Sequence, residues 1–138
     1  MALTVLDAGV VIAVLDASDI HHQAAMRALA TAIDRDDGLL IPVSAYAEVL
    51  VAPFRRGAEA VATLDAFLDA LPARVAPATR AVAARAAELR ARHGARLRLP
   101  DALVMATAMA IGADCVITTD ARWPSLPVRL EVVRPEAG

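Results

Sequence analysis

The segment of residues 99–120 constrains the fold more than any other part of the chain. Pro100 suits the first turn of a helix, where backbone N–H groups have no intrahelical partner, and Asp101 places negative charge at the positive end of the helix dipole. Nearly every residue from there to Ala110 is apolar, which is typical of a buried helix, and Gly112 supplies the left-handed residue that ends it. The segment therefore begins with a buried helix.

The second half of this segment predicts a strand followed by a carboxylate. Residues 115–118, Cys-Val-Ile-Thr, form a short run of β-forming residues without polar alternation, as in a fully buried strand. Asp120 lies just past its carboxyl end. Ligands of open α/β sheets bind at that end of the strands. The segment thus places one carboxylate at a helix start and another at the mouth of a strand.

The rest of the chain alternates short apolar strands with helices. We expect strands at residues 3–6, 39–42, 74–76, 115–118 and 128–133, the last of them at an edge. We expect the helices before 99 at residues 10–15, 20–33, 58–71 and 78–93, with another that begins near Ser44. This alternation predicts one α/β domain over residues 1–138, with a mainly parallel sheet of about five strands covered by helices on both faces.

Capping residues are expected at the start of two helices, where a side-chain oxygen accepts from a free N–H group. Ser18 or Asp19 suits the helix over residues 20–33, and Ser44 suits the helix after the second strand. The helix over residues 20–33 carries an apolar stripe at Ala25, Leu29 and Ile33.

Composition excludes several classes of protein. The chain is 58% hydrophobic, but its longest apolar runs fall well short of the ~20 residues that span a bilayer, and Asp7 interrupts what would be the apolar region of a signal peptide. We therefore expect a cytoplasmic protein with no membrane partner. A single cysteine, Cys115, excludes a disulfide framework. The net charge of −2 argues against capture of nucleic acid by overall charge, although the basic residues are all arginines and a local patch is compatible with it.

Four carboxylates are expected at the same edge of the sheet: Asp7 after the first strand, Glu48 one turn into the helix after the second, Asp101 and Asp120. Each pair of charges at ~4 Å costs roughly 4 kcal/mol at an effective dielectric of about 20, so protonation, arginines or a cation must offset the repulsion. Oxygen ligands without His or Cys suit Mg²⁺ or Mn²⁺, whose natural chemistry is attack of water on a phosphodiester. Taken singly, each acid is also an ordinary helix-start or turn residue.

The chain resembles the PIN-domain nucleases at four places in order: Asp7, Ser44-Ala-Tyr-Ala-Glu48, Leu99-Pro-Asp101-Ala-Leu and Ile117-Thr-Thr-Asp120. Its length and the order of its motifs are similar to those of the VapC-type ribonuclease toxins. The resemblance implies a three-layer α/β/α sandwich and a Mg²⁺- or Mn²⁺-dependent endoribonuclease that cleaves structured RNA such as tRNA or rRNA. It also implies a homodimer, and a cognate antitoxin protein that occupies the groove. By this likeness Asp7, Glu48 and Asp101 hold the principal metal ion and Asp120 completes the site.

One position departs from the family pattern. Many relatives carry Ser or Thr two residues after the first aspartate, where the hydroxyl supports the metal site, and this chain has Gly9 there. Thr118 and Thr119 are the hydroxyls expected near Asp120. The alternative function is a catalytically weak or inactive PIN-like module that binds RNA or a protein partner.

Two further points bear on the chemistry. Receiver domains and haloacid-dehalogenase-type phosphatases also gather carboxylates and Mg²⁺ at strand ends, but both need a lysine, and this chain has none. Arginines concentrate between residues 74 and 98, where they track an RNA backbone or form a solvated helix face. Those arginines are Arg74, Arg80, Arg85, Arg90, Arg92, Arg96 and Arg98.

Overall fold

A five-stranded parallel sheet forms the centre of the structure, a computed structural model that describes residues 2–135. The strands lie in the order β3-β2-β1-β4-β5, and each pairs in parallel with its neighbours. Their bounds are β1 Leu3–Leu6, β2 Gly38–Pro42, β3 Ala73–Ala76, β4 Cys115–Thr118 and β5 Arg129–Val132. The central strands are buried on both faces, as their unbroken apolar runs predict, and β5 is an edge strand as expected.

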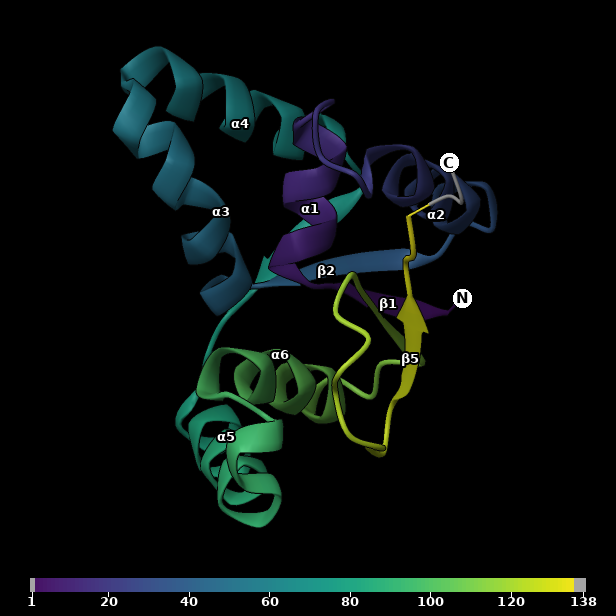
Figure 1. Ribbon diagram of the computed structural model, residues 1–138, viewed down its shortest axis with the longest axis vertical. Helices are drawn as coiled ribbons and strands as arrows, with labels where there is room; N and C mark the ends of the chain where they lie inside the picture. The colour runs from purple at the N-terminus through teal and green to yellow at the C-terminus, as the bar shows by residue number, and fades with distance from the viewer. Residues whose placement is uncertain (1, 136–138) are drawn as a thin grey trace.

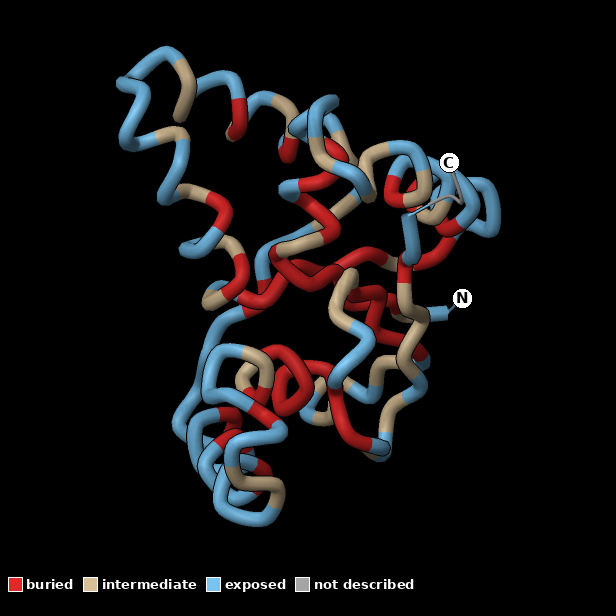
Figure 2. Tube along the Cα trace, viewed as in Figure 1, coloured by how far each residue is buried: buried red, intermediate tan, exposed pale blue. Residues whose placement is uncertain are grey.

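Helices cover both faces of this sheet. Figure 1 shows α1, α2, α3 and α4 above the sheet and α5 and α6 below it, so the three-layer α/β/α architecture is confirmed. The bounds are α1 Ala8–Leu15, α2 His22–Asp34, α3 Val43–Arg56, α4 Ala58–Ala70, α5 Arg80–His93 and α6 Leu99–Ala110, with a 3-10 turn, η1, at Gly94–Arg96. Figure 2 shows the buried positions concentrated along the strands and the inner faces of α1 and α6. Within residues 2–135, no helix is long and apolar enough to cross a membrane.

Two helices begin earlier than the sequence predicts. Helix α1 starts at Ala8 rather than Val10, because the Asp7 carboxylate accepts a hydrogen bond from the Ala8 N–H at 2.8 Å and so caps the helix directly after β1. Helix α3 starts at Val43, so the expectation that Ser44 is its cap is wrong. No residue separates β2 from α3, and Ser44 is already inside the first turn.

Helix α2 begins two residues later than expected. Asp19 accepts from the His21 N–H at 2.8 Å and thereby closes a turn that precedes the helix, while Ser18 bonds to Asp16. The expected stripe is wrong at its last position, since Ile33 is 37% exposed. A residue seven positions after the first of the stripe comes closer to the same face than one eight positions after it. The buried residues of α2 are Ala25, Leu29 and Ala32.

Helices α3 and α4 form a V-shaped pair whose tip points away from the sheet (Figure 1). They are joined at Gly57, which is exposed and has a φ of 125°, a conformation that favours glycine. The Tyr46 hydroxyl of α3 donates a hydrogen bond of 2.6 Å to the Asp65 carboxylate of α4. This bond fixes α4 against the half of α3 that is nearest to the sheet.

Candidate active site

Four acidic side chains line one pocket of about 510 Å³ at the carboxyl edge of the sheet. Asp7 follows β1, and Asp120 lies two residues after β4. Glu48 comes from α3, and Asp101 from the first turn of α6. We call this the acid pocket. The structure therefore brings together all four candidate residues, whose role as metal ligands stays a prediction.

The Asp7 carboxylate is held by hydrogen bonds on both of its oxygens. The Ala8 N–H donates to Oδ1 at 2.8 Å, and the Thr118 hydroxyl donates to Oδ2 at 2.7 Å. Thr118 Oγ1 also accepts a hydrogen bond from the Asp120 N–H at 3.1 Å, so one hydroxyl connects two of the four acids. Burial raises the pKa of Asp7, and the bonds from Thr118 and Ala8 oppose that rise. Asp7 thus has a fixed orientation before any ligand arrives.

Asp101 and Glu48 hold a proton more readily than exposed carboxyls do. Burial, reinforced by the charge of Asp7, raises the pKa of Asp101 to about 6, and Arg98 opposes this rise. Burial and the charge of Asp101 raise the pKa of Glu48, again against Arg98. Burial in the pocket is the main cause of both raised pKa values, and the charge of a neighbouring carboxylate adds to it. Perturbed carboxyls that line one pocket are typical of functional sites.

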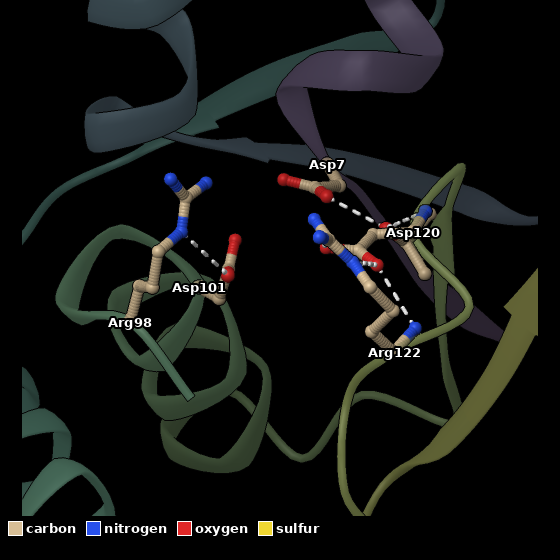
Figure 3. Close-up of polar contacts among 6 residues, drawn as sticks. Asp7, Arg98, Asp101, Asp120 and Arg122 are labelled. Carbon is tan, nitrogen blue, oxygen red and sulfur yellow. Dashed lines mark hydrogen bonds and ion pairs between the residues drawn. The ribbon is translucent and has the colours of Figure 1, made fainter. Parts of the chain in front are cut away.

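Two arginines reach into the acid pocket. Arg122 donates from Nε to Asp120 Oδ1 at 3.0 Å and from Nη2 to Oδ2 at 3.3 Å, and these bonds lower the pKa of Asp120. The Nε of Arg98 lies 3.8 Å from Asp101 Oδ2. Figure 3 shows both guanidinium groups among the aspartates. From the sequence, Arg98 belongs to a wider group of arginines and Arg122 is not singled out. The available signal for Arg122 is its place two residues after Asp120.

The donor atoms of the acid pocket fit a hard divalent cation. They are carboxylate oxygens with threonine hydroxyls nearby, the ligand set that Mg²⁺ and Mn²⁺ prefer. As the side chains stand, however, no three Asp, Glu, His or Cys residues within 2–135 are grouped to hold one metal ion. Asp101 and Asp120 pair instead with arginines. The pocket therefore has suitable chemistry, but its carboxylates must turn toward one another before they can share an ion.

The hydroxyl of Thr119 fills the space beside Gly9. A Cβ atom placed on Gly9, in the first turn of α1, would overlap Thr119 Oγ1. Both residues line the acid pocket. The family pattern predicts a hydroxyl group at position 9. In this chain the hydroxyl of Thr119, from the segment after β4, occupies that space instead. The other expected hydroxyl, that of Thr118, donates a hydrogen bond to Asp7 and accepts one from the backbone N–H of Asp120.

Comparisons with known proteins agree with this fold. The family model of the PIN domain matches residues 4–128. Among solved structures, VapBC2 from Rickettsia felis bound to a promoter DNA fragment matches with a TM-score of 0.76 and 15% identity, over 94% of this chain and 98% of that one. No curated protein matches the sequence.

Two further structures share the fold. FitAcB from Neisseria gonorrhoeae matches with a TM-score of 0.72 and 20% identity, over 93% of this chain and 96% of that one. VapC20 from Mycobacterium tuberculosis, a toxin that cleaves the sarcin-ricin loop, matches with a TM-score of 0.66 and 22% identity, over 82% and 86%. At these identities the likeness establishes a shared fold.

Proposed function

Because the chain belongs to the PIN-domain family, whose members are in general nucleases, we propose that it is a divalent-cation-dependent endoribonuclease and the toxin of a toxin–antitoxin pair. The observation that carries the proposal is the acid pocket itself. Four carboxylates from four separate segments line it, and three of them have raised pKa values because of burial and mutual repulsion. A structural role needs no such convergence.

The structural neighbours support the toxin role and suggest the class of substrate. VapC20 is a toxin that cleaves the sarcin-ricin loop, and VapBC2 is a toxin–antitoxin assembly bound to promoter DNA. By likeness to them we propose a structured RNA, such as tRNA or rRNA, as the substrate. A cognate antitoxin and a homodimer belong to the same proposal.

In this proposal Asp7, Glu48 and Asp101 hold Mg²⁺ or Mn²⁺, and Asp120 completes the set. When bound, the ion supplies an activated water and neutralises charge on the phosphate. Thr118 acts as a positioning residue, since its hydroxyl fixes the orientation of Asp7 and also accepts a hydrogen bond from the backbone N–H of Asp120. The raised pKa of Asp101 means that the acid pocket loses a negative charge below about pH 6, so metal binding should weaken there.

RNA cleavage by the purified protein, freed of antitoxin, tests the proposal. End-labelled structured RNAs are incubated with Mg²⁺, with Mn²⁺ or with EDTA, and Asp7→Asn and Asp101→Asn are compared with wild type. Asp69→Asn is the matched control, because Asp69 is exposed on α4 and does not line the acid pocket. We expect discrete cleavage that needs the metal ion, is lost in both pocket variants and persists in the control. Equal cleavage by Asp101→Asn would contradict the proposal.

A binding module without catalysis is the second candidate, and the arginine-paired acids favour it. Calorimetric titration with Mn²⁺ separates the two. A nuclease should bind Mn²⁺ in a manner that Asp101→Asn weakens, whereas a module that only binds RNA or a protein needs no such site. Absence of both cleavage and Mn²⁺ binding would favour the binding module.

A further inference from the structure

A second pocket of about 340 Å³ adjoins the acid pocket and is rich in arginine. Its lining includes Arg96, Arg98, Arg122 and Trp123 together with Asp101 and Asp120, and we call it the flanking pocket. We propose that the flanking pocket binds a phosphate of the RNA backbone next to the cleaved bond, and that Arg98 and Arg122 exchange their carboxylate partners for this phosphate when a divalent cation enters. The proposal rests on the proposed function and adds the residues that contact the substrate.

Three arginines from two segments converge on the flanking pocket. Arg96 lies in η1, Arg98 immediately before α6, and Arg122 in the segment after β4. A guanidinium group presents a planar fork of donors that matches a phosphate. The carboxylates in the same lining are Asp101 and Asp120, which also belong to the acid pocket. If these two acids take up a metal ion, the flanking pocket keeps three cations, of which Arg98 and Arg122 have lost their carboxylate partners.

The existing ion pairs are easily exchanged. The Arg98 side chain is 71% exposed while Asp101 is 15% exposed, and their atoms lie 3.8 Å apart, beyond hydrogen-bond distance. The Arg122 side chain is 85% exposed while Asp120 is 23% exposed. Solvent screens ion pairs of this kind, and they contribute little to stability. Both guanidinium groups can therefore leave at small cost, whereas the acids remain in the pocket.

Charge balance links this exchange to the metal ion. When all are ionised, the four carboxylates of the acid pocket carry −4 and Arg98 and Arg122 carry +2, which leaves −2. A divalent cation supplies the same +2 as the two arginines, and it repels them. Metal entry thus frees two cations at the edge of the site where a polyanion must approach. Metal binding and RNA binding are coupled favourably through the same side chains.

Trp123 adds a donor to the flanking pocket. Its indole N–H is buried, and among the described residues it has no hydrogen-bond partner. Buried donors without a partner are rare and costly. Trp123 directly follows Arg122, so a shift of this segment toward a phosphate can bring the N–H to an oxygen. The pocket therefore offers guanidinium groups and one neutral donor to the same ligand.

Two binding measurements test the proposal without reliance on catalysis. Affinity for Mn²⁺ is measured by electron paramagnetic resonance. Affinity for a fluorescein-labelled RNA hairpin is measured by fluorescence anisotropy over a range of salt concentrations, with Ca²⁺ as the divalent cation in the buffer. The variants are Arg96→Ala, Arg98→Ala and Arg122→Ala, each checked for folding by circular dichroism. Arg55→Ala is the matched control, because Arg55 is exposed in the last turn of α3 and lines neither pocket.

The expected effects on the two ligands have opposite signs. Arg98→Ala and Arg122→Ala should bind Mn²⁺ roughly two- to fivefold more tightly, as expected for the loss of a screened ion pair. The same variants should bind the hairpin more weakly. The negative slope of log K against log salt should become shallower by about 0.7 for each lost phosphate contact. Arg96→Ala should weaken only RNA binding, and the control should change neither.

Several results would overturn the proposal. Unchanged or weaker Mn²⁺ binding by both Arg98→Ala and Arg122→Ala refutes the exchange. Hairpin binding that is undetectable in wild type, or unchanged in all three variants, refutes the phosphate pocket. The failure of the proposed nuclease function has a different signature, because wild type then binds no Mn²⁺ and cleaves no RNA, whatever the arginine variants do to hairpin binding.

Discussion

Replacement of Asp101 with Asn is expected to stabilise the metal-free protein at pH 7.5. Folding raises the pKa of this carboxyl from 3.8 to about 6, chiefly because the side chain is buried. Above pH 6 the carboxyl is ionised in both the folded and the unfolded states, and the folded state carries the full free-energy penalty of the buried charge. A shift of about 2 pKa units at about 1.36 kcal/mol each corresponds to roughly 3 kcal/mol in the free energy of unfolding.

The pH window follows from the direction of this shift. Between pH 6 and pH 4 the folded protein binds the proton while the unfolded chain does not, so stability rises as the pH falls. Below 3.8 both states are protonated and the penalty is gone. Asn at this position has no charge to bury, so its advantage of about 1–3 kcal/mol at pH 7.5 should vanish near pH 4. Loss of the ion pair with Arg98 subtracts little, because Arg98 is exposed.

Urea denaturation in EDTA at pH 7.5, 6.0 and 4.5 measures these differences, with Asp69→Asn as a control that should follow wild type at each pH. Addition of Mn²⁺ at pH 7.5 should reverse the order, because a ligand that binds only the folded state stabilises it. The reasoning is refuted if Asp101→Asn is less stable than wild type in EDTA at pH 7.5, or if the difference between them is the same at all three values.

Three further predictions concern single contacts. Thr118→Val removes a buried hydroxyl that bonds to a carboxylate, so urea denaturation should show a loss of about 1.5–3 kcal/mol, with Thr118→Ser close to wild type. Gly9→Ala should lower the melting temperature despite the helix propensity of alanine, because the new methyl group overlaps the Thr119 side chain. Adding Thr119→Ala to the same chain should restore the melting temperature. If it does not, this contact is not the cause of the loss. Tyr46→Phe removes the bond to Asp65, so the unfolding free energy should fall by about 0.5–1.5 kcal/mol and hydrogen exchange in α4 should speed up, whereas unchanged exchange would contradict the role of this bond.

The fold could be predicted from sequence where a pattern is local and continuous. The apolar runs of β1 and β4 predict buried strands at the residues where the structure has them. Helix starts were harder, because the same residue can end one element and begin the next. Asp7 comes directly after β1 and caps α1, and Pro42 ends β2 where α3 begins. A capping rule that expects a separate turn therefore misplaces both starts.

The acids of the site could be predicted because each occupies a strand end or a helix start, positions that the sequence marks. Contacts that form only in space could not. Thr119 is placed against Gly9 by the pairing of β1 with β4, which joins segments more than a hundred residues apart. Arg122 reaches Asp120 because the segment after β4 folds back on itself. Arg122 follows Asp120 by two residues, but Arg90 follows Glu88 at the same spacing on the exposed surface of α5, so this spacing alone does not distinguish Arg122.

The direct passage from β2 into α3 makes the chain sensitive to length at that point. One residue inserted between Pro42 and Val43 would turn every later side chain of α3 by about 100° about the helix axis and carry Glu48 away from the other acids. An insertion at Gly57 has no such effect, because that turn is exposed and lies at the far end of the α3 and α4 pair. Loops grafted at Gly57, as tags or new binding segments, should leave the acid pocket in register.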